Sequence, residues 1–234
     1  MPLDNTILLI DIGNSAVKWQ FEGQFYSCLL ADFRLDKLPK ADRIFATCVG
    51  DKSLLNGLEV EFVKSPAEFG DFKSNYQNPT DLGSDRFLAM LAAISLFPEQ
   101  NLLIIDAGSA LTFDVIAADG LHQGGLITAG LGRLRSSFEQ FKTNSKQLKI
   151  AKLASNTEQA WDFGTGQMFV DSINAQIGRS QAEFDDLRIL LTGFDGKILS
   201  SKLNYSTTLE QNLVLKGLAV YVQNRQGKSV NGKV

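Results

Sequence analysis

Residues 6–18, TILLIDIGNSAVK, decide the fold, and the rest of the chain can be interpreted by comparison with them. Apolar, β-favouring residues run up to Asp11, and Gly13-Asn14-Ser15 then supplies the residue types of a tight turn. From Ala16 to Phe21 apolar and polar residues alternate, which is the pattern of a half-buried strand. After a short turn, residues 24–30 predict a third strand, so the chain is expected to open with three consecutive strands.

The second half of the chain repeats this arrangement. Residues 102–106 form another apolar run that ends in an aspartate, 95 residues after Asp11, and Ala107-Gly108-Ser109 forms another turn of small residues. Two further strands are expected at 110–117 and 121–128. Repetition at this distance indicates a duplicated domain rather than a solenoid of short repeats.

Helical segments fill the gaps between these strands. The first is expected to start with Ser84 as its N-terminal cap and to end at Pro98. Further helices are expected at 134–141, 155–177 and 208–221, with a buried strand at 187–192. Because strands and helices interleave, the sequence predicts an α/β fold. Its expected parts are an N-terminal half at 1–100, a C-terminal half at 101–225 and a frayed tail at 226–234.

Composition and charge argue against several classes of protein. The 234 residues are 44% apolar and carry a net charge of −3, which supports a folded core and argues against a nucleic-acid binder. No apolar run approaches the roughly 18 residues of a membrane-spanning helix, so no membrane association is expected. The two cysteines, Cys28 and Cys48, form no CxxC pair and favour a reduced, cytoplasmic protein. The only histidine, His122, excludes a multi-histidine zinc site, and Gly124-Gly125 nearby predicts a turn and a structural role for it.

The two Asp-x-Gly turns are the strongest chemical signal. Backbone N–H groups in such a turn can hold phosphate oxygens, and the carboxylate of Asp11 or Asp106 can hold a cation that accompanies the phosphate. Asn14-Ser15 and Ser109 add side-chain donors, and Lys18 adds a positive charge, although a solvated strand face would also suit a lysine. A single turn of this kind would be ordinary, but two in matching contexts predict a nucleotide held between the two hairpins.

A third feature is the loop from Tyr76 to Gly83, which runs into the expected helix start. Asp85 lies in the first turn of that helix, where the positive end of the helix dipole favours a carboxylate. Arg86 beside it can hold a substrate carboxylate through two parallel hydrogen bonds. Taken alone, these residues fit a simple helix cap equally well.

Five motifs together resemble those of the type III pantothenate kinase family. In chain order they are DIGNSAVKW at 11–19, Gly83-Ser84-Asp85-Arg86 with Tyr76 and Asn78-Pro79 before it, DAGSALTFD at 106–114, Gly124-Gly125-Leu126-Ile127 with Gly130, and Leu191-Thr192-Gly193. The first and third are similar to the family's phosphate motifs, and the second to its Gly-x-Asp-Arg substrate motif. The last two resemble its later glycine motifs, and all five occur in the family's order.

The resemblance implies the acetate and sugar kinase/Hsp70/actin fold, in which two ribonuclease H-like α/β halves enclose a nucleotide cleft. It also implies the transfer of the ATP γ-phosphate to pantothenate, the first step of coenzyme A biosynthesis. Family members are homodimers that use Mg²⁺ with ATP and a monovalent cation such as K⁺ or NH₄⁺. A homodimer is therefore expected, and the apolar helix at 87–96 is a candidate for its interface.

Carried onto this sequence, the resemblance assigns roles to individual residues. Asp85 would act as the base toward the pantothenate hydroxyl, and Asp106 would bind the monovalent cation. ATP would be bound by Asp11, Ile12, Gly13, Asn14, Ser15, Ala16, Val17, Lys18 and Ser109. Pantothenate would be bound by Tyr76, Gly83, Ser84, Asp85, Arg86 and Thr157.

Three positions depart from the family's pattern. Ser109 stands where threonine is usual, which keeps the hydroxyl, and Thr128-Ala129-Gly130 replaces a Pro-Gly ending. Phe194 stands where a second glycine is usual, so its ring is expected to fill space on the adenine side.

Two other functions stay open at the level of the sequence. One is an inactive regulatory or accessory protein on the same fold, and the other is an ATPase or kinase with a different substrate. Retention of Asp11, Asp85, Arg86 and Asp106 together favours an enzyme, because a protein that only binds has no need of all four. Tyr76 and the Gly-x-Asp-Arg motif favour pantothenate.

Overall fold

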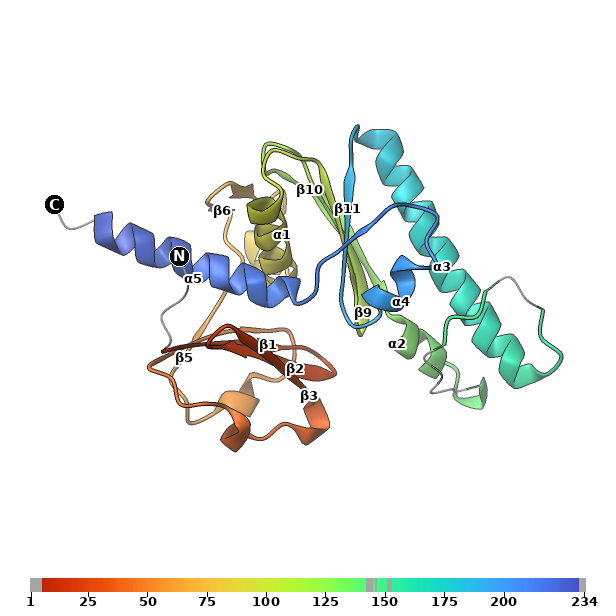
Figure 1. Cartoon of the computed structure of the whole chain (residues 1–234), viewed down its shortest axis with the longest axis horizontal. Coiled ribbons are helices and arrows are strands. Elements are labelled where there is room, and N and C mark those ends of the chain that lie inside the picture. The colour runs from red at the N-terminus through yellow and green to blue at the C-terminus, as the bar shows by residue number, and fades with distance from the viewer. Residues whose placement is uncertain (1–5, 142–144, 146, 151–152, 232–234) are drawn as a thin grey trace. The chain divides into compact units, whose positions relative to one another are not determined.

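The computed structural model describes residues 6–141, 145, 147–150 and 153–231, and the chain divides into two compact units. Unit 1 comprises Met1–Glu99, Asp119–His122 and Asn212–Val234, and unit 2 comprises Gln100–Ala118 and Gln123–Gln211. Each unit contains a five-stranded sheet with helices beside it (Figure 1). The observed fold is therefore α/β, as the sequence predicts.

The sheet of unit 1 has the strand order β3-β2-β1-β4-β5. Its strands are β1 (Ile7–Ile12), β2 (Ala16–Phe21), β3 (Gln24–Leu29), β4 (Arg43–Cys48) and β5 (Val60–Phe62). β1 pairs antiparallel with β2 and parallel with β4, which in turn pairs parallel with β5. The three strands expected at the start of the chain are confirmed, whereas β4 and β5 have no counterpart among the sequence predictions.

The sheet of unit 2 has the matching order β10-β9-β8-β11-β12. Its strands are β8 (Leu102–Ala107), β9 (Ala110–Ile116), β10 (His122–Ala129), β11 (Arg188–Thr192) and β12 (Thr208–Leu209). β8 pairs antiparallel with β9 and parallel with β11, and β11 pairs parallel with β12. The same order and the same directions at corresponding strands confirm the duplication.

The apolar core of unit 1's sheet lies against one of the two faces of that sheet. Alternate residues of β1, namely Leu8, Ile10 and Ile12, are buried there with Val17 and Trp19 of β2. Because side chains alternate between the two faces of a strand, Asp11 lies on the opposite face. The alternation of side chains along β1 therefore turns this carboxylate away from the apolar cluster.

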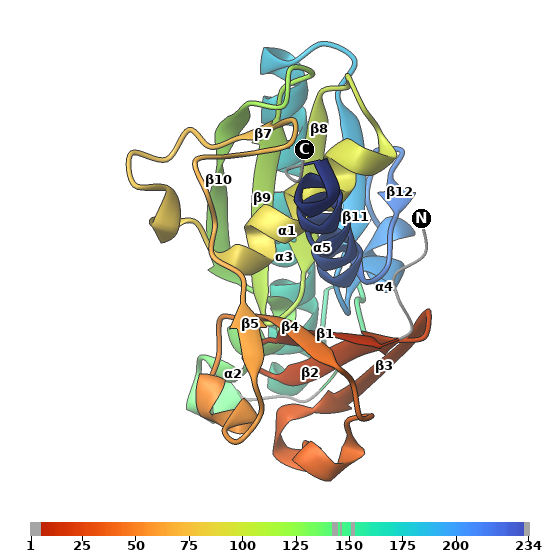
Figure 2. The same ribbon diagram turned by 90° about the vertical axis from the view of Figure 1, so that its left-hand side faces the viewer.

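Helices α1 (Ser84–Leu96) and α5 (Leu213–Asn231) pack side by side in unit 1 (Figures 1 and 2). Their backbones approach so closely that a Cβ atom at Gly217 would overlap the carbonyl oxygen of Leu88. Residues 86–94 of α1 are all buried. Most of the apolar residues at 87–96, the stretch proposed for a subunit interface, are therefore buried within the chain, whereas Leu96 at the end of the helix is 44% exposed.

The last helix differs from its prediction in two ways. It begins at Leu213, because Thr208–Leu209 form β12, and it groups with unit 1 although residues 208–221 were expected in the C-terminal half. It also continues to Asn231, so most of the tail expected to fray at 226–234 is helical. Residues 232–234 lie outside the described residues.

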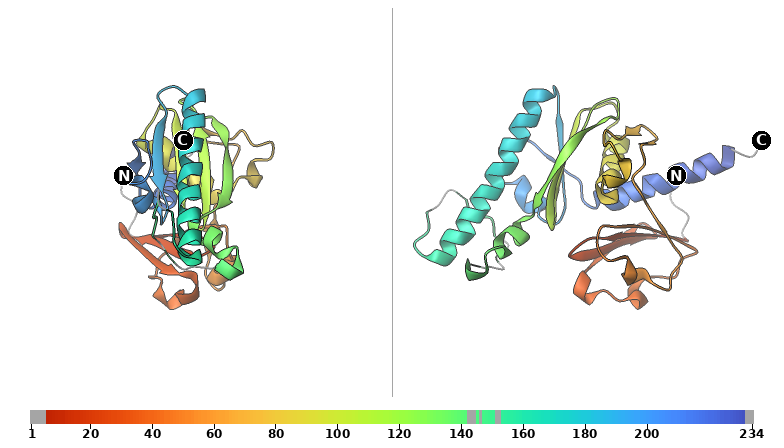
Figure 3. Two further views of the ribbon diagram at one scale, coloured as in Figure 1. Left: turned by 90° about the vertical axis from the view of Figure 1, so that its right-hand side faces the viewer. Right: turned by 180° about the vertical axis from the view of Figure 1, so that it is seen from behind.

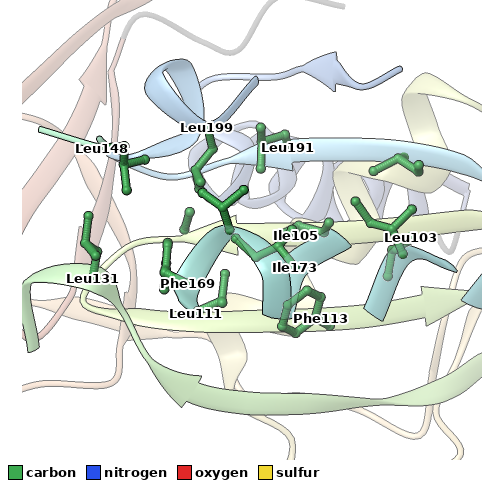
Figure 4. Close-up of a cluster of buried hydrophobic side chains, with 14 of the residues drawn as sticks. Leu103, Ile105, Leu111, Phe113, Leu131, Leu148, Phe169, Ile173, Leu191 and Leu199 are labelled. Carbon is green, nitrogen blue, oxygen red and sulfur yellow. The ribbon is translucent and has the colours of Figure 1, made fainter. Parts of the chain in front are cut away.

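The core of unit 2 lies between its sheet and the long helix α3 (Thr157–Glu183). Leu103 and Ile105 of β8 and Leu111 and Phe113 of β9 pack there against Phe169, Ile173 and Ile177 of α3, with Leu191 of β11 and Leu199 of α4 (Gly196–Ser200) beside them (Figure 4). Figure 3 shows α3 running along this sheet. Asp106 follows Ile105 and so lies on the other face of the sheet.

The start of the long helix α3 follows local capping. Asn156 caps α3, because its side chain accepts a hydrogen bond from the backbone N–H of Gln159 at 2.9 Å. The helix expected at 134–141 is instead α2 (Leu131–Ser136), followed by a 3₁₀ turn, η5 (Glu139–Phe141).

A buried arginine ties these segments together. The Arg135 side chain is fully buried, and it donates hydrogen bonds to the Thr165 hydroxyl and to the carbonyl oxygens of Ser145 and Gln147. Its guanidinium also pairs with the Asp162 carboxylate at 2.9 Å. Burial lowers the pKa of Arg135, and the charge of Asp162 offsets part of that effect.

The remaining elements are short. They are β6 (Glu68–Phe69), β7 (Phe72–Lys73), η1 (Leu30–Asp32), η2 (Leu35–Lys37), η3 (Lys52–Leu55) and η4 (Pro79–Asp81). Within the described residues, no helix has the length and apolar character needed to cross a membrane.

We expect Gly217→Ala to destabilise the protein, because the added methyl group would push α1 and α5 apart. Overpacking of this kind typically costs about 1–3 kcal/mol, which should lower the melting temperature by several degrees. Gly164→Ala is the matched control, since a Cβ atom at Gly164 in α3 would meet nothing within 4 Å. Thermal unfolding of both variants checks the prediction, and equal melting temperatures would contradict it.

Candidate active site

A polar row crosses three strands of unit 1 at the end of β1. Asp11 is paired with Lys18 of β2 and with Thr47 of β4. Residues that face each other on neighbouring strands point to the same side of the sheet, with Cβ atoms roughly 4.5–5.5 Å apart. Asp11 is 8% exposed, so the carboxylate sits in a largely buried position with a lysine and a threonine on either side.

The turn after β1 has the closed backbone expected of an Asp-x-Gly motif. The N–H of Gly13 donates to the carbonyl oxygen of Ala16 at 3.0 Å, and the N–H of Leu30 donates to the carbonyl oxygen of Ser15 at 3.0 Å. Asn14 and Ser15 themselves are exposed at the tip. Of the other residues expected to bind ATP, Ile12 and Val17 are buried and Ala16 is half-buried. They therefore belong to the packed base of the turn and not to its exposed tip.

The start of α1 is bound directly to this row. The hydroxyl groups of Thr47 and Ser84 lie 2.6 Å apart and share a hydrogen bond. Ser84 is therefore not the helix cap that the sequence predicts: Gly83 holds the cap position, and no side chain caps it. The sequence analysis did not identify Thr47 as a site residue. The strand that carries it was not predicted, and a single threonine near the end of that strand gives no further signal.

The Asp85 carboxylate folds back over the first turn of α1. Its Oδ1 accepts a hydrogen bond from the backbone N–H of Arg86 at 2.8 Å. A Cβ atom at Gly83 would lie 2.6 Å from the same oxygen, so any larger residue there would force the carboxylate to shift. The first phosphate motif and the Gly83–Arg86 motif are therefore brought together within unit 1.

Arg86 and Tyr76 form a second cluster in the same unit. Arg86 Nη1 donates to the hydroxyl oxygen of Tyr76 at 3.0 Å, and the guanidinium carbon lies 5.8 Å from the centre of the Tyr76 ring. The Tyr76 ring stacks on the imidazole of His122, with ring centres 5.5 Å apart and planes 20° apart. His122 is fully buried at the start of β10, which agrees with the strand expected at 121–128, so the turn predicted from Gly124-Gly125 is wrong.

The second Asp-x-Gly turn repeats the first within unit 2. Asp106 is paired with Thr192 of β11, as Asp11 is with Thr47, and with Thr112 of β9. The N–H of Gly108 donates to the carbonyl oxygen of Ala110 at 2.9 Å. Gly193 has a φ of +88°, and a Cβ atom there would overlap the Asp106 carboxylate, so this residue has to be glycine.

Three further residues of unit 2 were expected in the site. Ser109 lies in the second turn, where its carbonyl oxygen accepts from the N–H of Gly130 at 3.0 Å. Thr157 is the exposed first residue of α3. Phe194 is 73% exposed, so its side chain extends into solvent beside Gly193 rather than filling space in the unit.

Metal and thiol chemistry are limited by the residues present. In the part of the chain that the structure describes, no group of three or more His, Cys, Asp or Glu residues could hold a metal ion. A cation at Asp11 or Asp106 would therefore take other ligands from phosphate oxygens, backbone carbonyls or water. Burial raises the pKa of the Cys48 thiol next to Thr47, so this thiol stays protonated at neutral pH.

Two sheets of identical order, each with an Asp-x-Gly turn after its central strand, define the acetate and sugar kinase/Hsp70/actin class. Solved structures of this class match the chain with TM-scores of 0.52 and 0.54 at 10% and 11% identity, which shows the fold alone. A crystal structure from Campylobacter jejuni, assigned to the Baf family of transcriptional activators, matches with a TM-score of 0.67 at 22% identity. It covers 94% of this chain and 99% of that one.

The chain belongs to the type III pantothenate kinase family. The family model described as "Type III pantothenate kinase" matches residues 52–179. A protein of that name from Colwellia psychrerythraea is 32% identical in a match that covers 86% of this chain and 90% of the relative. Another, from Flavobacterium johnsoniae, is 31% identical in a match that covers 91% of this chain and 96% of that relative.

Proposed function

We propose that this chain transfers the γ-phosphoryl group of ATP to the primary hydroxyl of pantothenate, giving 4′-phosphopantothenate in the first step of coenzyme A biosynthesis. The observation that carries the proposal is the 2.6 Å contact between Thr47 and Ser84, which joins the phosphate turn to the substrate motif. Family membership supports the choice of substrate, because the relatives are named type III pantothenate kinase.

The hairpin of residues 11–18 is the proposed phosphate site. Asn14 and Ser15 are exposed, so phosphate oxygens can approach their backbone and side chains, and Lys18 adds a positive charge on the Asp11 face. The Asp11 carboxylate offers the hard oxygen ligand that Mg²⁺ prefers. Mg²⁺ bound with ATP would neutralise charge on the transferring phosphoryl group.

Asp85 is the proposed base. Phosphoryl transfer requires the attacking alcohol to be aligned with the γ-phosphate, and a carboxylate that accepts the alcohol's proton does this. The hydrogen bond from the Arg86 N–H orients the Asp85 carboxylate over the first turn of α1, where the attacking hydroxyl would be aligned. Gly83 and Ser84 would shape the floor beneath the substrate.

Arg86 is the proposed partner of the pantothenate carboxylate. A guanidinium has five donors, and the Tyr76 hydroxyl takes one of those on Nη1. The planar, forked shape of a guanidinium suits a two-point pair with a carboxylate. Tyr76 would cover the chain of the substrate, and Thr157 would donate a hydrogen bond to one of its polar groups.

Asp106 and Ser109 complete the proposal from unit 2. Asp106 would hold a monovalent cation, K⁺ or NH₄⁺, and Ser109 would contact ATP. The proposal also includes a homodimer, which the family resemblance implies. A reducing, cytoplasmic location is proposed from the two free cysteines, Cys28 and Cys48.

The decisive experiment is a coupled assay of ADP release with and without pantothenate. We expect pantothenate-dependent ADP release from the wild type, whereas an inactive relative would release none and a kinase of another substrate would not respond to pantothenate.

Asp85→Asn should lower kcat by roughly 10²-fold or more, the usual scale for a positioned base. Asp81→Asn is the matched control, since Asp81 is exposed four residues earlier. A folded Asp85→Asn enzyme with turnover near the wild type would refute the assignment.

Asp106→Asn should weaken the response of the enzyme to K⁺, because the change removes a full negative charge beside the proposed monovalent cation. The measurement is a K⁺ titration of the rate at fixed Mg²⁺ and ATP, followed by a Mg²⁺ titration. Asp171→Asn on the exposed side of α3 is the control for loss of one charge. An unchanged K⁺ response in Asp106→Asn would show that the cation lies elsewhere.

Arg86→Lys should raise the KM for pantothenate with little change in the KM for ATP. Lysine keeps the charge but loses the planar fork, and a lost charge-assisted hydrogen bond costs about 1.5–3 kcal/mol, roughly 10- to 150-fold in affinity. Arg43→Lys, on the exposed end of β4, is the control. An equal rise in both KM values, or a rise for ATP alone, would assign Arg86 to the phosphates or the fold instead.

A further inference from the structure

We propose that His122 is a positioning residue for pantothenate, which acts through the ring of Tyr76 on the guanidinium of Arg86. The inference rests on the proposed function, because it deepens the account of the same substrate site. It gives a role to the chain's only histidine, which lies outside the family motifs that the sequence carries.

The backbone that carries His122 is held firmly against β7. The N–H of Lys73 donates to the carbonyl oxygen of Gly120 at 3.0 Å, and Lys73 forms a parallel bridge with Leu121. Gly120 has a φ of +83°, and a Cβ atom there would overlap the backbone of Asp71. This close approach leaves the turn no room to shift, so the position of His122, two residues later, is set by backbone contacts.

The imidazole meets Tyr76 on a face that solvent does not reach. His122 is 0% exposed, and its ring is nearly parallel to that of Tyr76, at 5.5 Å and 20°. Phe72 of β7 lies 6.5 Å from the same imidazole. The histidine therefore presents a fixed flat surface on which the tyrosine ring rests.

Tyr76 needs such a surface because its own backbone is irregular. Residues 74–78 belong to no helix or strand, so side-chain contacts set the direction of the ring. The hydroxyl of that ring accepts the 3.0 Å hydrogen bond from Arg86. A tilt of the ring would move this acceptor away from Nη1 and so remove one of the contacts that orient the guanidinium toward a carboxylate.

The expected consequence is confined to one substrate. Loss of the stack should weaken the binding of pantothenate, because Arg86 is the proposed partner of its carboxylate, whereas ATP is proposed to bind at the Asp11 turn on another strand pair. The KM for pantothenate should therefore rise while kcat and the KM for ATP stay near the wild-type values. A merely structural role would instead lower the amount of folded enzyme and leave both KM values unchanged.

The test compares two substitutions that both fill the buried space and both remove the imidazole nitrogens. His122→Phe keeps a flat ring against Tyr76, and His122→Leu does not. The free energy that a stacked aromatic pair contributes predicts that the KM for pantothenate is roughly 3- to 10-fold higher in His122→Leu than in His122→Phe. Equal KM values for pantothenate in the two folded variants would overturn the proposal.

A double-mutant cycle with Tyr76→Ala tests whether the effect passes through the tyrosine. In that background His122→Leu and His122→Phe should give the same KM for pantothenate, because the ring they act on is gone. A difference that persists there would overturn the proposed route. Tyr26→Leu, in the stacked pair of Trp19 and Tyr26, is the control for loss of a ring in unit 1. If the wild type itself showed no pantothenate-dependent ADP release, the proposed function would fail instead.

Discussion

The hydrogen bond between Thr47 and Ser84 is the contact on which the candidate site of unit 1 depends. Thr47 is paired with Asp11 across the sheet, and Ser84 opens the helix that carries Asp85 and Arg86. Thr47 is fully buried, and a buried hydroxyl left without a partner costs about 1–3 kcal/mol. The pair therefore holds a strand end and a helix start together, although their residues are 37 positions apart.

Much of the fold could be predicted because its signals are local. The alternation of residues 16–21 and the apolar runs before Asp11 and Asp106 identify β1, β2 and β8 without knowledge of their neighbours. β4 could not be found in this way, because what makes it a central strand is its pairing with β1 and β5. The role of Ser84 was misjudged for the same reason: a serine before a helix suits a cap, and only Thr47 shows where its hydroxyl goes.

Long-range contacts explain the other differences between sequence and structure. Gly217 signals a close helix crossing only once Leu88 is known to lie opposite, so α5 was expected with the C-terminal half although it packs on α1. His122 sits two residues before a Gly-Gly pair, and that composition is typical of a turn. The tertiary contact with Tyr76 places it in a buried stack instead, which no local pattern could reveal.

The two copies of the phosphate turn also differ in a way that bears on the cations. Each aspartate has a threonine on its parallel neighbour, Thr47 for Asp11 and Thr192 for Asp106. On the antiparallel side, Asp11 faces Lys18, whereas Asp106 faces Thr112. The lysine beside Asp11 attracts anionic phosphate together with the Mg²⁺ that accompanies it, whereas the hydroxyl of Thr112 brings no positive charge to Asp106. This asymmetry supports the proposed division of labour, with phosphate held at the first turn and a monovalent cation at the second.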